Sequence, residues 1–75
     1  MDYNLLKTFS KVSELGSFTQ AAKVLNQPKS RVSRSIARLE SEVGVELIRR
    51  TTRKISLTSV GEEFYKNITP HLRGI

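Results

Sequence analysis

Residues 16–44 read GSFTQAAKVLNQPKSRVSRSIARLESEVG, a stretch with two helical patterns and a short break between them. Ser17 can cap the first helix, because Gln20 follows it at the spacing of a capping box. The small and apolar side chains expected to face inward are those of Ala21, Ala22 and Leu25. Residues 26–29 favour a turn followed by a first helical turn. The stretch therefore predicts a helix-turn-helix.

The second helix of this pair has the clearest pattern in the chain. At about 100° per residue, its apolar side chains fall on one narrow face. The residues of that face are Val32, Ile36, Leu39 and Val43. The opposite face carries short or basic side chains, namely Ser30, Ser33, Arg34 and Ala37, with Lys29 and Arg38 on its flanks. Gly44 is expected to end the helix.

An amphipathic helix is also expected before Gly16. Asp2 can cap its start, and apolar residues follow at helical spacing. They are Leu5, Leu6, Phe9, Val12 and Leu15. After Gly44 the apolar period changes, and two short strands are expected over residues 47–50 and 54–57, with Thr51 and Thr52 at the tip of the hairpin.

A last helix should follow the hairpin. Thr58 or Ser59 can cap it, and Ser59 with Glu62 forms a second capping-box pattern. Its apolar side comprises Phe64, Tyr65, Ile68 and Leu72. Pro70 is expected to kink this helix or to end it near Thr69.

Positive charge is concentrated in one part of the chain. The formal net charge is +6, and eight of the thirteen basic residues lie within residues 29–54, beside three glutamates. A basic helix followed by a basic hairpin suits a polyanion with grooves, and DNA is the first candidate.

The size and composition limit the other possibilities. Seventy-five residues make one small domain that buries only about 60–65% of its unfolded surface, so we expect it to depend on a partner subunit or a further domain. The chain has no cysteine, no apolar run near the roughly 20 residues of a membrane span and no signal-peptide pattern. We expect a soluble, cytoplasmic protein that does not bind membranes.

The outward face of the basic helix is a candidate for reading base edges in the DNA major groove. Arg34 can donate two hydrogen bonds to guanine. Single contacts are expected from Lys29, Ser30 and Ser33. The alternative is an ordinary solvated face, which is the commoner explanation on composition alone. Nucleic-acid contact is favoured because the face carries four cations before its first carboxylate, Glu40, and short side chains allow close approach.

Residues 49–54 hold four cations in six positions. They can form a wing in which Arg53 enters the minor groove. The alternative is a charged edge strand that discourages aggregation, and both can hold at once. The residues expected to contact phosphates are Thr19, Gln27, Arg31, Arg38, Arg50, Thr51 and Lys54.

The last helix is a candidate for dimerisation. Phe64 and Ile68 are expected to cover the core, whereas Tyr65, Leu72 and Ile75 have little domain beneath them to bury them. These three residues are therefore the predicted dimer contacts.

Catalysis has little support in the sequence. His71 is the only histidine, and Glu62 and Glu63 are adjacent, so they point about 100° apart on a helix. There is no glycine-rich phosphate loop, and one histidine with scattered glutamates cannot build a metal site. We expect no enzymatic activity, no metal and no cofactor.

An ordered pattern of residues runs from position 5 to about 65. It consists of Leu6-Lys-Thr-Phe9, Glu14-Leu-Gly-Ser-Phe-Thr-Gln-Ala-Ala22, Leu25, Val32-Ser33-Arg34, Ile36, Leu39-Glu40, Gly44, Leu47, Arg50, Arg53, Leu57-Thr58 and Gly61. In this order and spacing, it resembles the N-terminal DNA-binding domain of the LysR-type transcriptional regulators of bacteria.

The resemblance implies a mainly α fold, a winged helix-turn-helix with a three-helix core and a two-stranded wing over residues 1–58. Residues 59–75 would start a linker helix through which two subunits pair. It implies major-groove reading through Lys29, Ser30, Ser33 and Arg34, and a minor-groove role for Arg53. Members usually continue into an effector-binding domain, so this chain is expected to be a fragment, with any small-molecule effector bound by the absent part.

The chain departs from the family pattern at three places. Pro28-Lys29-Ser30 stands where members often have Ser-Gln-Pro, which affects the helix start and the first base-reading positions. Ile48 replaces a usual phenylalanine, and Pro70 falls within the linker helix.

We therefore expect a homodimer that binds a double-stranded DNA operator and regulates transcription. One alternative is an RNA-binding module, disfavoured because only Tyr3 and Tyr65 are left as exposed aromatic residues. Another is a module that docks on an acidic protein or an anionic membrane, disfavoured because the basic helix exposes few large apolar side chains. The operator, the regulated genes and the direction of regulation do not follow from the sequence.

Overall fold

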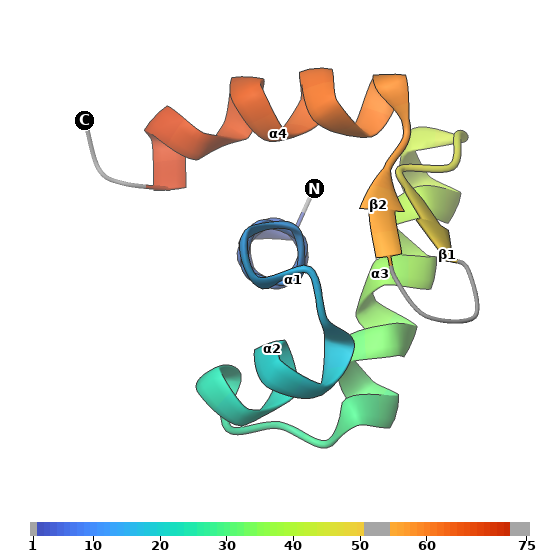
Figure 1. Cartoon of the computed structure of the whole chain (residues 1–75). Helices are drawn as coiled ribbons and strands as arrows, with labels where there is room; N and C mark the ends of the chain where they lie inside the picture. Colours follow the sequence, from blue (N-terminus) through green and yellow to red (C-terminus); the bar gives the residue numbers. More distant parts are fainter. Residues whose placement is uncertain (1, 51–54, 73–75) are drawn as a thin grey trace.

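The computed structural model describes residues 2–50 and 55–72, the last two by their backbone alone. This part of the chain forms four helices and a two-stranded sheet, which lies at one edge of the helices (Figure 1). The elements, in chain order, are α1 (Tyr3–Leu15), α2 (Phe18–Leu25), α3 (Lys29–Val43), β1 (Ile48–Arg50), β2 (Ile55–Leu57) and α4 (Ser59–Leu72).

The ends of the first three helices lie where local chemistry places them. Asp2 accepts a hydrogen bond from the first turn of α1 over 2.9 Å, and the Ser17 hydroxyl does the same for α2 over 3.1 Å. Gly16 and Gly44 end α1 and α3 in the left-handed region, with φ of 66° and 80°. Asn26 ends α2 in the same region (φ 57°), which asparagine tolerates better than most residues. The predicted helix-turn-helix is confirmed, with a three-residue turn over residues 26–28.

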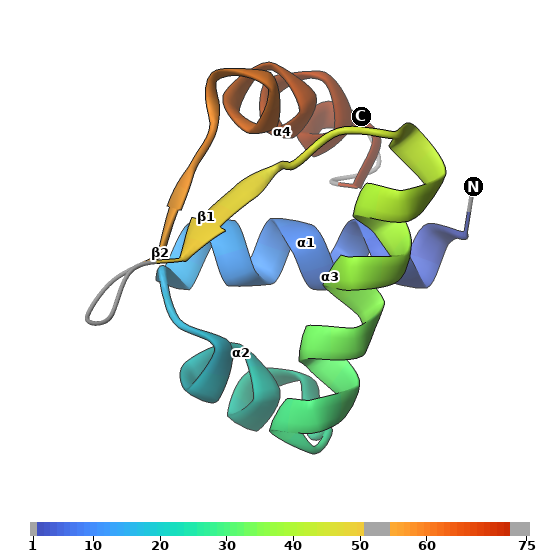
Figure 2. The same cartoon turned by 90° about the vertical axis from the view of Figure 1, so that its right-hand side faces the viewer.

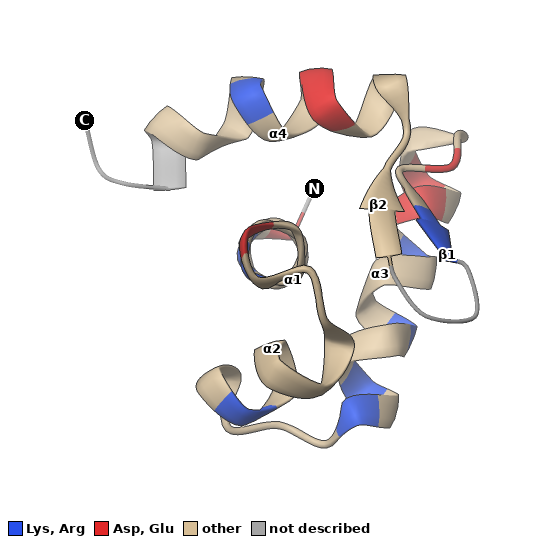
Figure 3. Cartoon of the chain, in the orientation of Figure 1, with Lys and Arg blue, Asp and Glu red and all other residues tan. Residues whose placement is uncertain are grey.

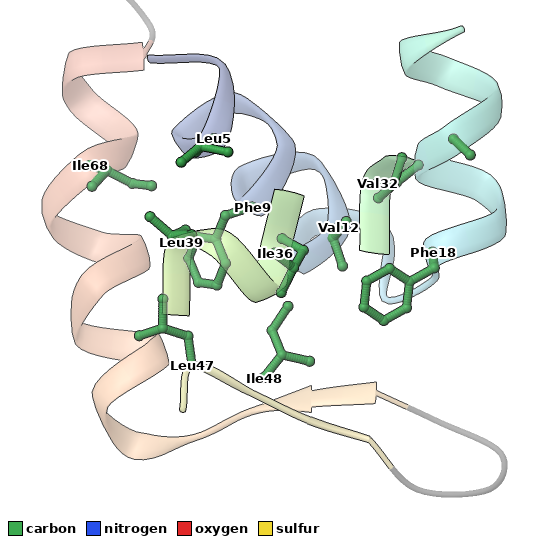
Figure 4. Close-up of a cluster of buried hydrophobic side chains, with 12 residues drawn as sticks. Leu5, Phe9, Val12, Phe18, Val32, Ile36, Leu39, Leu47, Ile48 and Ile68 are labelled. Atoms are coloured by element: carbon green, nitrogen blue, oxygen red, sulfur yellow. The ribbon is translucent and has the colours of Figure 1, made fainter. Parts of the chain in front are cut away.

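α1 lies between α2 and α4 in both views, and α3 runs along the side of this stack (Figures 1 and 2). The inward faces of these helices meet in one hydrophobic core, to which the start of the sheet contributes (Figure 4). Its largest fully buried side chains are Phe9, Ile36, Leu39, Leu47, Val12 and Val32. α4 joins the core through Ile68 and through Phe64, whose ring meets the Phe9 ring edge-on at 5.5 Å.

The sheet pairs β1 with β2 in antiparallel register, Ile48 opposite Leu57 and Arg50 opposite Ile55. β1 begins one residue later than predicted. At this start the Leu47 N–H donates to the Glu40 carboxylate over 2.8 Å, and the Ile48 N–H donates to the same oxygen over 3.0 Å. Glu40 therefore fixes the start of the sheet to α3.

The start of α4 is capped by Thr58 rather than by Ser59. The Gly61 N–H donates to the Thr58 hydroxyl oxygen over 2.9 Å, and Ser59 is already the first helical residue. The predicted capping box of Ser59 with Glu62 is wrong in this respect. Thr58 also donates to the Glu46 carbonyl over 2.8 Å, which ties the start of α4 to the segment before β1.

Of the two outcomes predicted for Pro70, a kink or an end near Thr69, the end near Thr69 is wrong. The helix continues through Pro70 to Leu72. Proline removes the bond that its own N–H would donate, and its ring crowds the carbonyl four residues earlier, but its position near the helix end leaves few turns to disturb. The Thr69 hydroxyl donates to the Tyr65 carbonyl over 2.6 Å in the preceding turn.

Candidate nucleic-acid interface

The outward face of α3 is open to solvent, as the sequence predicted. Lys29, Ser30 and Arg34 are exposed, and Ser33 is half-buried. The inward face holds Val32, Ile36 and Leu39, none of which is exposed. The apolar stripe therefore turns the four predicted base-reading residues away from the core, where they are accessible to a ligand.

Charge divides α3 along its length (Figure 3). The part that follows Pro28 is basic and carries Lys29, Arg31, Arg34 and Arg38, whereas the end of the helix is acidic. Arg31 and Arg38 are exposed. The Arg38 Nε pairs with Glu42 at 3.3 Å across one turn, so Arg38 is partly neutralised within its own helix.

A shallow hollow lies beside the turn of the helix-turn-helix. It is lined by Thr19, Ala22, Lys23, Asn26, Gln27, Pro28 and Lys29. The structure thus brings together Thr19 and Gln27, both predicted phosphate contacts, with the predicted base-reading residue Lys29. Pro28 makes no side-chain cap for α3, and uncapped N–H groups at a helix start suit an anion.

Arg50 takes a different position from the other cations. Its guanidinium carbon lies 4.6 Å from the centre of the Phe18 ring, at the start of α2. Its Nη1 donates to the Ser33 hydroxyl oxygen over 3.4 Å. The predicted phosphate contact is therefore engaged with both helices of the helix-turn-helix.

Several predicted site residues lie outside the described residues. They are the wing residues Thr51, Arg53 and Lys54, the dimer residue Ile75 and the side chain of Leu72. The third predicted dimer residue, Tyr65, is half-buried against the core and lines a groove between α1 and α4 with Lys7, Ser10 and Thr69. Tyr65 was predicted to have too little of the domain to pack against, and this is correct for only part of its side chain.

Three features of the interface and its support were not predicted from the sequence. Lys23 joins the hollow beside the turn, and its place one helical turn after Thr19 is a signal that could have found it. Phe18 supports Arg50, and Glu40 holds the start of β1. The last two contacts join residues far apart in sequence and have no local pattern.

The described part of the chain offers little support for a metal site or a membrane-spanning helix. No three histidine, cysteine, aspartate or glutamate residues gather there in a way that could hold a metal ion. Within residues 2–50 and 55–72, no helix combines the length and apolar character that crossing a membrane requires.

Comparisons with known proteins agree on one family. The model described as "Bacterial regulatory helix-turn-helix protein, lysR family" matches residues 3–62. An HTH-type transcriptional repressor of Pseudomonas aeruginosa is 48% identical over 60 residues, which are 80% of this chain and 19% of that protein. The HTH-type transcriptional activator AaeR of Escherichia coli is 43% identical over 61 residues, 81% of this chain and 20% of that protein. The chain thus spans about a fifth of the length of the curated relatives it matches.

A solved structure gives the same result in three dimensions. The BenM DNA-binding domain, in a crystal structure with benA site 1 DNA, matches with a TM-score of 0.94 at 35% identity. The match covers 99% of this chain and 83% of that one.

Proposed function

The chain belongs to the lysR family of bacterial regulatory helix-turn-helix proteins, and we propose that it binds double-stranded DNA with sequence preference, as the DNA-binding part of a transcriptional regulator. The observation that carries this proposal is the exposed basic face of α3, with Arg34 at its centre. A helix of this kind fits the major groove, where each base pair presents a distinct pattern of donors and acceptors. The solved complex of the BenM domain with DNA supports the same reading.

Sequence choice is assigned to the outward face of α3. Arg34 would donate two hydrogen bonds to guanine O6 and N7. Lys29, Ser30 and Ser33 would make single contacts beside it. Ser30 is short and exposed, so it leaves room for the helix backbone to approach the groove wall.

Most of the affinity would come from phosphates, which bind without regard to sequence. Thr19 and Gln27 border the hollow beside the turn, and Lys23 adds a cation there. Arg31 and Arg38 would contact the backbone from the flanks of α3. In the wing we propose Thr51 and Lys54 as phosphate contacts and Arg53 as a minor-groove contact, from the sequence pattern alone.

We also propose that residues 1–58 form the DNA-binding unit and that residues 59–75 begin a helix that pairs two subunits. Tyr65, with its half-buried ring at the groove between α1 and α4, would be part of that contact. Sedimentation over a range of concentrations tests the pairing. A Tyr65→Ala change should weaken it, and a chain that stays monomeric at every concentration would contradict it.

The central experiment is selection of bound duplexes from a random pool by the whole chain. An enriched inverted repeat is expected, with half-sites spaced by whole turns of about 34 Å or a multiple. Single-stranded RNA should compete poorly with the selected duplex. Enrichment of no motif, or better binding to the RNA, would contradict the proposal.

A further inference from the structure

The Arg50 side chain connects three elements of the domain. It starts from β1, stacks on Phe18 at the start of α2, and donates to Ser33 on α3. Ser33 stands directly before Arg34. One side chain thus ties the wing to the residue that adjoins the centre of the proposed reading face.

Arginine suits these two contacts together better than lysine does. A planar guanidinium can lie against an aromatic face while its edge N–H groups donate hydrogen bonds. Phe18 is only 9% exposed and belongs to the core, so the stacked guanidinium rests on a fixed base. The contact with Phe18 therefore favours a guanidinium position from which Nη1 reaches Ser33.

The contact also determines what Ser33 can offer to a ligand. A serine hydroxyl has one hydrogen to donate and two lone pairs that accept. Arg50 donates to the Ser33 oxygen, which occupies one lone pair and leaves the hydroxyl hydrogen to point toward an acceptor. In the major groove, the acceptors are guanine O6 and N7, adenine N7 and thymine O4, whereas cytosine presents the N4 donor.

We infer that Arg50 is a positioning residue that holds the Ser33 hydroxyl as a hydrogen-bond donor and so sets discrimination at one base pair. This inference rests on the proposed binding of double-stranded DNA. It gives Arg50 a role in sequence preference, whereas the sequence pattern alone predicted that Arg50 contacts a phosphate. Ser33 is expected to disfavour cytosine at the position it faces.

The test compares Arg50→Lys with Arg49→Lys. Both positions are exposed on β1, both changes keep the positive charge, and Arg49 has no side-chain hydrogen bond or ion pair with another described residue. Binding is measured to the duplex selected by the wild-type chain and to all its single base-pair variants. Arg50→Lys should lose roughly three- to tenfold of discrimination at one base pair, the range of a single hydrogen bond. Arg49→Lys should keep it.

A Ser33→Ala change should remove discrimination at the same base pair. Adding Arg50→Lys to Ser33→Ala should then change that position no further. Identical behaviour of the two lysine variants would mean that Arg50 acts as a point charge on a phosphate, which overturns the inference. An Arg50→Lys loss spread evenly over all base pairs would overturn it as well.

The contact itself is tested without DNA. The Phe18 ring should shift the proton resonances of the Arg50 side chain upfield, and Phe18→Leu should remove this shift. If the wild-type chain shows no shift, the inference is overturned even when DNA binding is intact. If the shift is present in a chain that selects no duplex, the proposed function fails, and the role of Arg50 toward DNA fails with it. An unchanged urea midpoint for Arg50→Lys excludes loss of the fold as the cause of any change.

Discussion

The two ends of α3 share one apolar stripe but differ in charge and in the contacts of their polar side chains. The stripe runs from Val32 to Leu39 and is fully buried. On the polar side, residues 29–38 carry four cations and no carboxylate, whereas residues 39–43 carry Glu40 and Glu42. The same helix is therefore open and basic at its start and engaged with its own domain at its end.

The basic start of α3 is the part suited to DNA recognition, whereas its acidic end supports the fold. Glu40 accepts hydrogen bonds from two backbone N–H groups at the start of β1, and Glu42 pairs with Arg38. At the other end, Lys29 and Arg34 make no ion pair with another residue of the described chain. A carboxylate at the start of the helix would repel phosphate, whereas one at the end serves the hydrogen bonds of the sheet. Substitutions at the start of α3 should therefore change DNA affinity, whereas substitutions at its end should change the stability of the fold.

The largest effect is expected from Glu40→Ala. It removes one acceptor shared by the Leu47 and Ile48 N–H groups, and hydrogen bonds to charged groups are among the stronger ones. The free energy of unfolding, measured in urea, should fall by about 2–3 kcal/mol. Glu42→Ala is the matched control, and it should change stability by less than about 0.5 kcal/mol because its ion pair is exposed. Equal losses in the two variants would remove the structural role of Glu40.

Gly61→Ala tests the same supporting region from the opposite side. A Cβ at Gly61 would collide with the backbone carbonyl of Leu47, the residue that Glu40 also holds. The start of α4 would have to move away, at a cost of about 1–3 kcal/mol in stability. Val60→Ala, at an exposed neighbour, is the control and should change the urea midpoint little. A stable Gly61→Ala chain would show that α4 can shift without loss.

At the start of α3, Arg34→Ala should affect DNA binding and leave stability nearly unchanged. The loss is expected to be about 1–3 kcal/mol on the selected duplex, with relaxed preference at one base pair. Lys7→Ala is the control for charge, because Lys7 is exposed on α1, outside the reading face and the helix proposed to pair two subunits. Binding isotherms on the duplex and its variants make the comparison. Equal losses on every sequence would reject base reading by Arg34.

The smallest effect is expected from Arg31→Ala. Arg31 is exposed on the flank of α3, where a phosphate contact would weaken binding to all sequences alike. The plot of log affinity against log salt should become shallower by about 1, since one fewer counterion is released. If the slope stays unchanged while one base pair loses its preference, Arg31 belongs with the reading face.

Local patterns in the sequence predicted most of the fold. The period of Val32, Ile36 and Leu39 fixed which side of α3 is buried, and therefore which side is exposed. Gly16 and Gly44 marked two helix ends because the left-handed conformation favours glycine. These signals are local, so a single sequence is enough to read them.

Contacts between distant residues could not be predicted in this way. Glu40 lies seven residues before its partner Leu47, and Arg50 lies seventeen residues after its partner Ser33. Both polar side chains resemble surface residues in the sequence, and only the packing of α2, α3 and β1 brings them to their partners. The extension of α4 through Pro70 was missed because the rule that proline ends a helix is weaker within the last turn, where few bonds remain to be broken.

Replacing guanine by 7-deazaguanine, one position at a time in the selected duplex, tests most directly whether Arg34 reads a base edge. This change removes the N7 acceptor from the major groove and leaves base pairing intact. We predict that one replacement weakens binding of the wild-type chain and has no further effect on Arg34→Ala. If every replacement affects the two chains equally, the exposed face of α3 does not read guanine through Arg34.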